Sequence, residues 1–448
     1  MSEPAELRRQ PRVLARAEHS VSRASISPNA IKVLYRLHRA GFLACLVGGA
    51  VRDLLLGRKP KDFDIGTNAR PQQVRQLFRN ARVIGRRFRL VMVRFSDEVV
   101  EVATFRRSPE PPEIEDGETT DVLAPTPEAD EFGTPEEDAW RRDFTVNGLF
   151  YNIADFSVID HVGGLEDLQA GVIRTIGAPR LRFAEDPVRM MRAVEYGARL
   201  GFRLEDDLSD AIAEMHGEIR RAAPARIAYE LVESLKGGQA LPIFRGLEGF
   251  GLLEHSVPEA HRAASGGGDA LLWRLLGTAD ELVRGGEKLS EETLLGLLFL
   301  PSVLDALMRE GEKAPAPGEV ERDVRDRVDA AALRLALSNY RSHLLRSSFL
   351  LLSRLLSPPR SAKFVLRTVK HEAFPVAWQI AHLLGAAAPR YRPQLGPWEQ
   401  AVARVRAGLA PEVAPARPEG EKRGKRGRRR RGGARRRAGA AGAAGSAS

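Results

Sequence analysis

The spacing of apolar residues predicts a small mixed α/β unit near the N-terminus. Residues 30–40 place apolar side chains at helical spacing, and the continuous apolar run 42–47 predicts a buried strand. The pattern that follows predicts a helix over 51–56, a strand around 63–65, a helix over 71–79 and strands over 87–95 and 98–104. These elements indicate one unit of roughly residues 42–178, and we expect residues 1–28 to be polar and irregular.

From residue 186 onward the pattern is almost entirely helical. We expect helices over 186–200, 206–219 and 225–236, then amphipathic runs to about residue 408. The predicted fold is therefore an α/β head followed by an all-α neck and body. The expected divisions are a polar segment 1–28, a head 29–178, a neck 179–240, a body 241–410 and a disordered tail 411–448.

One acidic segment interrupts the head. Residues 108–138 hold twelve acidic residues, no basic residues and several prolines, which predicts a mobile loop inserted in the domain. Such a loop either modulates access to the head or is a variable insertion, and the sequence leaves both open.

The excess positive charge lies at the C-terminus. The net charge is +10, and the twelve Lys or Arg and two Glu of residues 417–448 account for all of it. This arginine-rich tail has little apolar surface to bury, so it is predicted to be disordered and to bind nucleic acid through counterion release, or else to act as a solubility tail. The RNA-binding candidates are Lys422, Arg423, Lys425, Arg426, Arg428, Arg429, Arg430, Arg431, Arg435, Arg436 and Arg437.

Composition excludes several classes of protein. No run of 18 apolar residues is present and residues 1–10 are polar, so we expect neither a membrane span nor a secretory signal. The single cysteine, Cys45, lies in an apolar run and predicts a buried thiol rather than a disulfide. These features fit a reducing cytoplasm.

The stretch GGAVRDLLLGRKPKDFDIG, residues 48–66, carries the first candidate chemistry. Gly48 and Gly49 let backbone N–H groups approach a phosphate at a predicted helix start. Asp62 and Asp64 lie one residue apart, so on a strand they point to the same face and offer hard oxygen ligands to Mg²⁺. The alternative is an exposed turn with two solvated aspartates. The combination at this spacing favours a nucleoside triphosphate site with catalytic metals.

Three further segments carry weaker signals, each with a structural alternative. Glu101, in VVEVATF, points away from its valine neighbours and is either a third carboxylate of the metal site or an edge-strand residue in water.

In RRDFTVNG, Arg142 suits a triphosphate, Asp143 suits orienting that arginine or assisting the metals, and Asn147 suits a sugar hydroxyl. A helix cap or a structural ion pair is the alternative for Asp143.

In EDPVRMMRAVEY, the spacing of Asp186, Arg189 and Arg192 offers donors and acceptors to the edge of a base. An intrahelical ion pair between Glu185 and Arg189 is the alternative.

Five motifs taken in order resemble one enzyme family. LVGGAVRDLLLG…KDFDI, EVATFR, RRDFTVNGLFYN, DHVGGLEDL and EDPVRMMRA look like the motifs of class II template-independent nucleotidyltransferases, over roughly residues 20–240. That group includes tRNA CCA-adding enzymes and bacterial poly(A) polymerases, and has a polymerase-β-like nucleotidyltransferase head. VIGRRFRLVMVRF and the arginine-rich tail resemble the poly(A) polymerase branch.

The resemblance implies roles for individual residues. Asp62 and Asp64 would bind metal, with Glu101 and Asp143 as further active-site acids. Gly49, Arg52 and Arg142 would meet the triphosphate, while Asp186 and Arg189 would read the adenine, with Arg192 nearby. The neck over 179–240 would bind the base and RNA, and the body over 241–410 would bind RNA. Two positions depart from the family pattern: Glu195 replaces an arginine usual in relatives, and Gly148 replaces alanine or serine.

The resemblance implies that AMP from ATP is added to RNA 3′ ends in the presence of Mg²⁺, with release of pyrophosphate. Expected partners are mRNA and other transcripts, with RNA-degradation or RNA-chaperone proteins as further candidates and no membrane. The alternatives are a tRNA nucleotidyltransferase that adds all or part of the 3′ CCA, and a non-catalytic RNA-binding protein.

Overall fold

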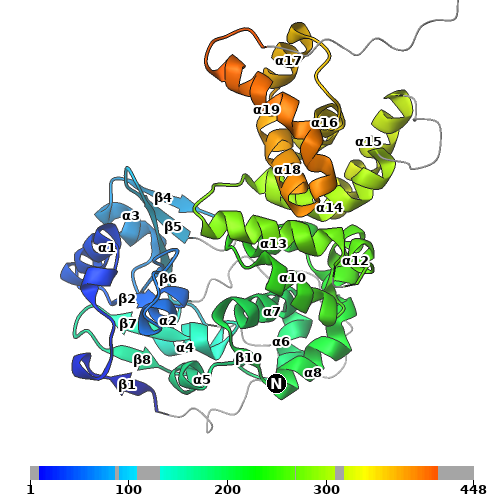
Figure 1. Ribbon diagram of the computed structural model, residues 1–448. Helices are drawn as coiled ribbons and strands as arrows, with labels where there is room; N and C mark the ends of the chain where they lie inside the picture. Colours follow the sequence, from blue (N-terminus) through cyan, green and yellow to red (C-terminus); the bar gives the residue numbers. More distant parts are fainter. Residues whose placement is uncertain (1–9, 86–89, 108–131, 268, 308–316, 412–448) are drawn as a thin grey trace, which may run out of the picture.

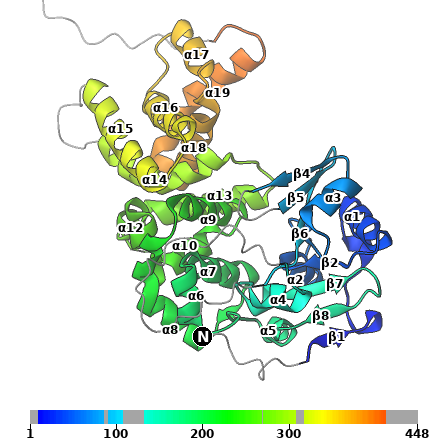
Figure 2. The ribbon, with the colours of Figure 1, turned by 180° about the vertical axis from the view of Figure 1, so that it is seen from behind.

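A computed structural model describes residues 10–85, 90–107, 132–267, 269–307 and 317–411. An α/β head lies beside a helical region, and a lobe made mainly of the last helices stands above both (Figure 1). Seen from behind, the same three parts keep this arrangement (Figure 2). The structure confirms the predicted α/β head followed by helices, while the tail 412–448 lies outside the described residues.

The head is built on an eight-stranded sheet in the order β1-β8-β7-β2-β3-β6-β5-β4. β3 pairs in parallel with β6, and the other neighbours pair antiparallel. The strands are β1 Arg12–Leu14, β2 Ala44–Val47, β3 Ile65–Thr67, β4 Ala81–Ile84, β5 Leu90–Arg94, β6 Val99–Thr104, β7 Leu149–Asn152 and β8 Val158–Asp160.

Strand β2 lies in the middle of this sheet and is buried on both faces. Ala44 and Leu46 pack into the larger head core, while Cys45 and Val47 pack on the opposite side. This two-sided burial explains why β2 reads as a continuous apolar run rather than an alternating one. Cys45 is a free, buried cysteine, as predicted, and burial raises the pKa of its thiol to about 12.

The helices of the head pack around the sheet. Helix α1 begins at Pro28, where proline is tolerated in the first turn, and Ser27 caps it by accepting hydrogen bonds from the Asn29 and Ala30 N–H groups. The head helices are α1 Pro28–Arg39, α2 Gly49–Leu55, α3 Pro71–Leu77, α4 Pro135–Trp140 and α5 Gly164–Ala170.

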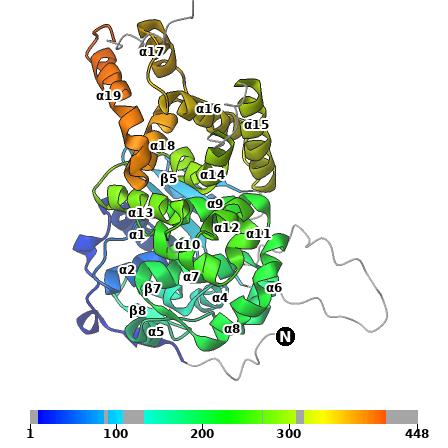
Figure 3. The same cartoon turned by 45° about the vertical axis from the view of Figure 1, so that its right-hand side comes forward.

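The helical region begins after β9 (Val172–Ile173), and β10 (Arg203–Leu204), which follows its first two helices, pairs in parallel with β9. Its helices are α6 Pro179–Glu185, α7 Val188–Leu200, α8 Asp206–Met215, α9 Pro224–Lys236, α10 Ala240–Gly249, α11 Leu252–Ser256, α12 Pro258–Ala264, α13 Leu271–Arg284, α14 Glu291–Leu307, α15 Pro317–Arg334, α16 Asn339–Leu355, α17 Ala362–Val369, α18 Phe374–Ala387 and α19 Arg392–Arg406. Figure 3 shows α15 and α19 on opposite sides of the upper lobe.

A single apolar core extends from Phe144 in the head to Val402 in α19. Because this core continues across residue 240, it marks no separation between neck and body. The domain boundaries drawn from the sequence therefore stay predictions.

The acidic segment is ordered over its last residues, contrary to the prediction of a loop through residue 138. α4 begins at Pro135, and Thr134 and Glu137 form a reciprocal capping box before it. The acidic residues of the first turn favour the positive end of the helix, so here a high acidic content signals a helix start. Residues 108–131 lie outside the described part.

Other boundaries also differ from the sequence expectation. Residues 12–14 form the edge strand β1 in the segment expected to be irregular, because Val13 and its neighbours pair with β8. β4 over 81–84 was not expected, and it pairs antiparallel with β5. Of the strand expected over 87–95, residues 87–89 lie outside the described part and β5 covers 90–94. The helix expected over 206–219 ends at Met215 and continues as a 3₁₀ turn, His216–Arg221.

No helix within the described ranges is long and apolar enough to cross a membrane.

Candidate active site

A sharp turn at the end of β2 opens the site. Gly48 has φ of 69°, and its N–H donates to the Leu149 carbonyl oxygen at 2.9 Å. A Cβ at this position would lie 2.8 Å from Arg142 Nη1. Glycine is therefore required here both for the left-handed backbone and for the close approach of Arg142.

The two aspartates of the DxD motif lie just before β3 rather than on it. The predicted strand around 63–65 is wrong in this respect, because β3 begins at Ile65. Only the Asp64 carbonyl oxygen extends the pairing, by accepting from the Val47 N–H at 3.0 Å, and β2 then ends at the Gly48 turn. Even so, both Asp62 and Asp64 line one cavity of about 310 Å³.

The carboxylates of this region repel one another. Asp64 is open to solvent at the cavity wall, but the surrounding protein and the nearby charge of Asp62 raise its pKa. Burial and the charges of Asp64 and Asp62 likewise raise the pKa of Glu101. A site that gathers negative charge in this way favours a bound cation.

Glu101 lies on β6, which is an interior strand, so the alternative of an edge-strand residue is wrong. Its side chain is half-buried and is repelled by the charges of both aspartates, but it does not line the cavity. Across the described residues, no group of three or more His, Cys, Asp or Glu is gathered closely enough to hold a metal. The structure thus places at the cavity two carboxylates that form no ion pair with a described residue, Asp62 and Asp64, and a further acid, Glu101, farther back.

Two arginines lie beside the glycine turn. Arg52, on α2, is 2% exposed; its guanidinium binds Asp53 at 2.7 Å and donates to Asn147 Oδ1 at 2.5 Å. Arg142 Nη2 donates to Asp138 Oδ2 at 2.9 Å. The partner that orients Arg142 is therefore Asp138, one turn earlier, and not Asp143 as considered from the sequence.

Asp143 is committed to an ion pair instead. It accepts from Arg192 at 2.7 Å, from Asn147 Nδ2 at 3.1 Å and from the Phe144 N–H at 2.8 Å. Burial alone would raise its pKa, but the charge of Arg192 and these hydrogen bonds outweigh burial and lower it. The structural ion pair considered for Asp143 is thus observed, and it bridges head and neck.

The amide of Asn147 is also occupied, since it links Arg52 to Asp143. Its side chain is 6% exposed, and its amide groups are used in hydrogen bonds to these two charged residues, so in this structure they are not available to a sugar hydroxyl.

The structure does not bring Asp186 and Arg189 into this cavity. Asp186 accepts from Arg226 Nη1 at 2.9 Å, and Arg189 Nη1 donates to Glu185 at 2.9 Å. The intrahelical pair considered as the alternative for Arg189 is therefore present. Arg192, the third member of the motif, does line the cavity.

Several residues of the site were not foreseen. Tyr196 lies with its ring centroid 5.1 Å from the Arg52 guanidinium carbon, 5.2 Å from that of Arg192 and 4.9 Å from that of Arg199. Its hydroxyl accepts from Arg192 Nη2 at 2.8 Å. The spacing of Arg192, Tyr196 and Arg199 on one helix face was the signal available in the sequence.

The neck supplies a set of acids to the same cavity. Glu230 lies 3.4 Å from Arg192, and Glu233 lies 2.5 Å from Lys61 in the loop that carries Asp62. Glu195, the departure from the family pattern, is 8% exposed and lies 3.7 Å from Arg199. Burial raises the pKa of Glu195 although Arg199, Arg192 and Arg52 oppose this.

The cavity thus lies between head and neck, and every predicted site residue outside the tail has been placed. Those that line it are Gly48, Gly49, Arg52, Asp62, Asp64, Arg142, Asp143, Asn147 and Arg192, together with the unforeseen Lys61, Glu195, Tyr196, Arg199, Tyr229, Glu230 and Glu233. Asp62 and Asp64, which form no ion pair with a described residue, share the cavity with arginines that are fixed by acidic partners. This combination suits a triphosphate with bound metal.

Comparisons with known proteins agree with this geometry. Residues 44–174 match the family model "Poly A polymerase head domain", and residues 201–263 match "Probable RNA and SrmB- binding site of polymerase A". The Poly(A) polymerase I of Salmonella typhi is 38% identical over 385 residues, which span 83% of this chain and 81% of that protein.

CCA-adding enzymes are related over a shorter stretch. The CCA-adding enzyme of Bacillus velezensis is 35% identical over 226 residues, half of this chain and 54% of that protein. The Bacillus stearothermophilus CCA-adding enzyme, solved in complex with CTP, has the same fold, with a TM-score of 0.56 and 23% identity over 84% of this chain and 86% of that one. The match to poly(A) polymerases extends over most of the chain, whereas the match to CCA-adding enzymes covers half of it. The chain therefore belongs to the bacterial poly(A) polymerase I family.

Proposed function

We propose that this protein adds AMP units from ATP to the 3′-hydroxyl of RNA without a template. The observation that supports this most is the head–neck cavity, where Asp62 and Asp64 face a set of cations already held in place. Similarity to curated poly(A) polymerases over most of the chain points the same way.

In the proposed reaction the RNA 3′-oxygen forms a bond to the α-phosphorus of ATP. The bond between the α-phosphorus and the α,β-bridging oxygen breaks, pyrophosphate leaves, and the hydroxyl proton passes to water in the open cavity. The reaction needs no covalent enzyme intermediate, so the protein acts by positioning and by stabilising charge.

The residues present fit Mg²⁺. Magnesium commonly uses one or two protein carboxylates and completes its shell with water and substrate phosphates, which agrees with the two lining acids, Asp62 and Asp64, that form no ion pair with a described residue. Burial and, after it, the charge of Asp62 raise the pKa of Asp64, and a divalent cation bound there would favour the charged form against both. When bound, such ions activate the attacking hydroxyl and neutralise the triphosphate.

The phosphates would lie near the glycine turn. Gly48 and Gly49 leave room for close approach, and the guanidinium groups of Arg52 and Arg142 are fixed by Asp53 and Asp138. Their carboxylate partners hold each guanidinium in position before a nucleotide arrives, which reduces the entropy lost on binding.

Reading of the adenine edge by Asp186 and Arg189 is also part of the proposal. It requires both residues to exchange their present partners, Arg226 and Glu185, for the base. Both of those pairs include an exposed side chain, so the exchange costs little.

The remaining parts of the proposal concern the setting. The domain boundaries, RNA binding by the basic tail, a role in mRNA processing, a cytoplasmic location and association with RNA-degradation or RNA-chaperone proteins follow from the sequence alone. Deleting residues 417–448 should weaken binding of generic RNA and flatten its salt dependence; an unchanged slope would reject the role of the tail.

The test is extension of two labelled substrates, a generic RNA and a tRNA without its CCA end. Each nucleotide is offered singly, and ATP and CTP are offered together. Long ladders on generic RNA with ATP alone are expected. One to three additions confined to the tRNA and including CTP would instead establish a CCA-adding enzyme, and no extension of either would leave an RNA-binding protein.

A further inference from the structure

A second concave surface lies in the helical body, separate from the active-site cavity. It is a cleft of about 620 Å³ formed by α12, α13, α14, α15 and the 3₁₀ turn Pro389–Tyr391. The two sets of lining residues have no member in common. Three of the residues lining the cleft are arginines: Arg262, Arg327 and Arg390.

None of these three exposed arginines is bound to a carboxylate of the described residues. Arg262 Nε donates only to the Pro258 carbonyl oxygen of its own helix, at 3.2 Å. Arg390 donates to the Tyr391 hydroxyl at 3.1 Å, and its guanidinium carbon lies 4.9 Å from the Tyr391 ring centroid. Arg327 makes no hydrogen bond, ion pair or ring contact with any residue in the described ranges.

Two carboxylates also line the cleft, but they do not neutralise it. Glu259 is bound to Arg334 at 2.5 Å. Asp305 has no ion pair among the described residues and is exposed on α14. The cleft therefore presents three available guanidinium groups against one available carboxylate, which favours an anionic ligand.

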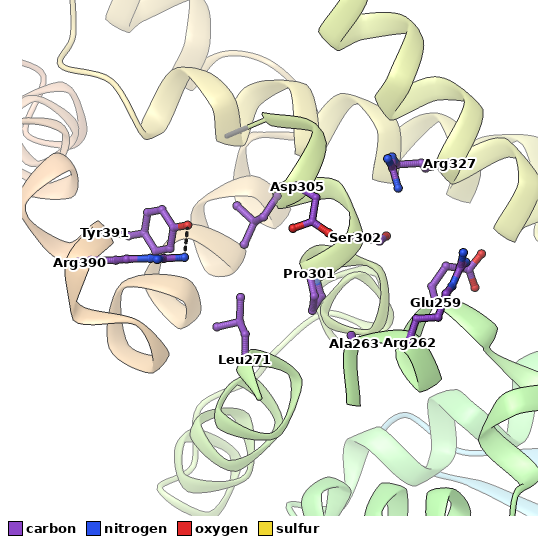
Figure 4. A pocket seen from close by; sticks show the side chains of 11 residues that line it. Glu259, Arg262, Ala263, Leu271, Pro301, Ser302, Asp305, Arg327, Arg390 and Tyr391 are labelled. Atoms are coloured by element: carbon purple, nitrogen blue, oxygen red, sulfur yellow. Dashed lines mark hydrogen bonds between the residues drawn. The ribbon is translucent and has the colours of Figure 1, made fainter. Parts of the chain in front are cut away.

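The layout favours a long ligand over a small one. In Figure 4, Arg390 and Tyr391 lie on one side of α14, while Arg262 and Arg327 lie on the other, with Asp305 and Ser302 between them. A ligand that meets all three arginines must therefore cross α14. A polyanion with regularly spaced charges satisfies this condition, whereas a single phosphate does not.

We propose that this cleft binds a single-stranded segment of RNA laid across α14. Arg262 and Arg327 would contact phosphates, and a base would stack on the guanidinium plane of Arg390, which Tyr391 supports from behind. Asp305 would accept a hydrogen bond from a 2′-hydroxyl or an exocyclic amine. The assignment rests on the proposed function in taking RNA as the substrate, and it adds an anchor for the strand remote from the 3′ end.

The first test compares two triple variants of the full chain. Arg262→Gln, Arg327→Gln and Arg390→Gln together remove the cleft charges. The matched control, Arg322→Gln, Arg360→Gln and Lys363→Gln, removes three exposed charges from the same lobe that line no part of the cleft. Binding of a labelled single-stranded RNA is followed by fluorescence anisotropy at increasing salt.

Loss of the two phosphate-facing cations, Arg262 and Arg327, should lower the slope of log affinity against log salt by about 1.4, since each contact with a single strand contributes about 0.7. The control should leave the slope unchanged. Equal slopes for the two variants would overturn the proposal.

The second test locates the RNA directly. A single-stranded RNA carrying 4-thiouridine is photocross-linked to the full chain, and the cross-linked peptide is identified by mass spectrometry. A cross-link within the peptide of Arg390 and Tyr391 that excess ATP does not displace supports the proposal. Displacement by ATP would show a mononucleotide site, and absence of that cross-link would show that RNA passes elsewhere; either result rejects the assignment. If the protein cross-links here but extends no RNA, the proposed function is refuted while the assignment of the cleft as an RNA-binding site is retained.

Discussion

The active-site cavity and the cleft across α14 both gather basic side chains, but they treat those charges differently. In the cavity every cation has an acidic partner: Arg52 with Asp53, Lys61 with Glu233, Arg142 with Asp138, Arg192 with Asp143 and Glu230, and Arg199 with Glu195. In the cleft none of the three arginines has an acidic partner within the part of the chain that the structure describes.

This difference separates two uses of charge. A paired guanidinium has its orientation set before the ligand arrives, so it can hold a reacting group in one geometry. An unpaired one attracts a polyanion without specifying where each phosphate lies. The comparison indicates that the protein fixes the reacting groups in one geometry but binds the RNA strand without fixing the position of each phosphate.

The largest effect is expected from breaking the pair that joins head and neck. Arg192→Gln leaves Asp143 buried without its cation and should lower the free energy of unfolding by about 3 kcal/mol. Urea unfolding measures this change. Adding Asp143→Asn should recover much of the loss, and Arg327→Gln in the cleft should change stability by less than about 0.5 kcal/mol. If Arg192→Gln and Arg327→Gln lowered the free energy of unfolding equally, the distinction between paired arginines in the cavity and unpaired arginines in the cleft would be wrong.

The next effect concerns the two unpaired acids. Asp64→Asn should reduce extension of RNA by more than about 100-fold, because a metal ligand matters at least as much as the groups behind it. RNA binding should stay nearly unchanged, since the strand is held elsewhere. Single-turnover extension and anisotropy on the same preparation separate the two. Activity within a few-fold of the unsubstituted protein would reject the metal assignment.

The pH dependence should be a smaller effect, and activity should be lost at a higher pH than protonation of a paired acid would require. Asp64 and Glu101 have raised pKa values, so both take up protons at a higher pH than ordinary carboxyls do. Extension should therefore fall as pH drops through that raised range, by about tenfold for each pH unit for one essential carboxylate. Because Mg²⁺ competes with the proton, raising its concentration should shift the acid limb to lower pH. Asp143, whose pKa is lowered, should not contribute to this limb.

The smallest effect is expected at the contact between the catalytic loop and α9. Lys61 binds Glu233 but is largely exposed, so Lys61→Met should slow extension by only about threefold, the scale of an exposed ion pair. Lys59→Met is the matched control, because Lys59 is exposed in the same loop and forms no ion pair there. If both variants behave alike, the contact does not position the loop.

Local motifs were predictable from the sequence because the chemistry they require is local. Two glycines at a turn and two aspartates one residue apart identify a phosphate and metal site wherever the strand begins, so the error at β3 did not matter. The helical neck and body followed from periodicity in the same way.

The partners of the charged residues were not predictable, since they depend on contacts distant in sequence. Asp143 and Arg192 are 49 positions apart and meet only because α7 packs beside the head. The pairing of Arg142 with Asp138 was visible as i,i+4 spacing, but the acidic segment concealed the start of α4. The cleft draws on five separate elements and corresponds to no motif.

The strand order has a consequence for how the chain is made. β1 is the first strand to leave the ribosome, yet its partner β8 is the last strand of the sheet, and β2 likewise waits for β7. Contacts so far apart in sequence make folding slow, although lengthening the loop between them adds little to the entropy of closure. At translation rates of about 5–20 residues per second, the sheet stays incomplete for roughly 7–30 seconds after β1 emerges, so we expect chaperones or helix α1 to cover β2 until Asp160 is made.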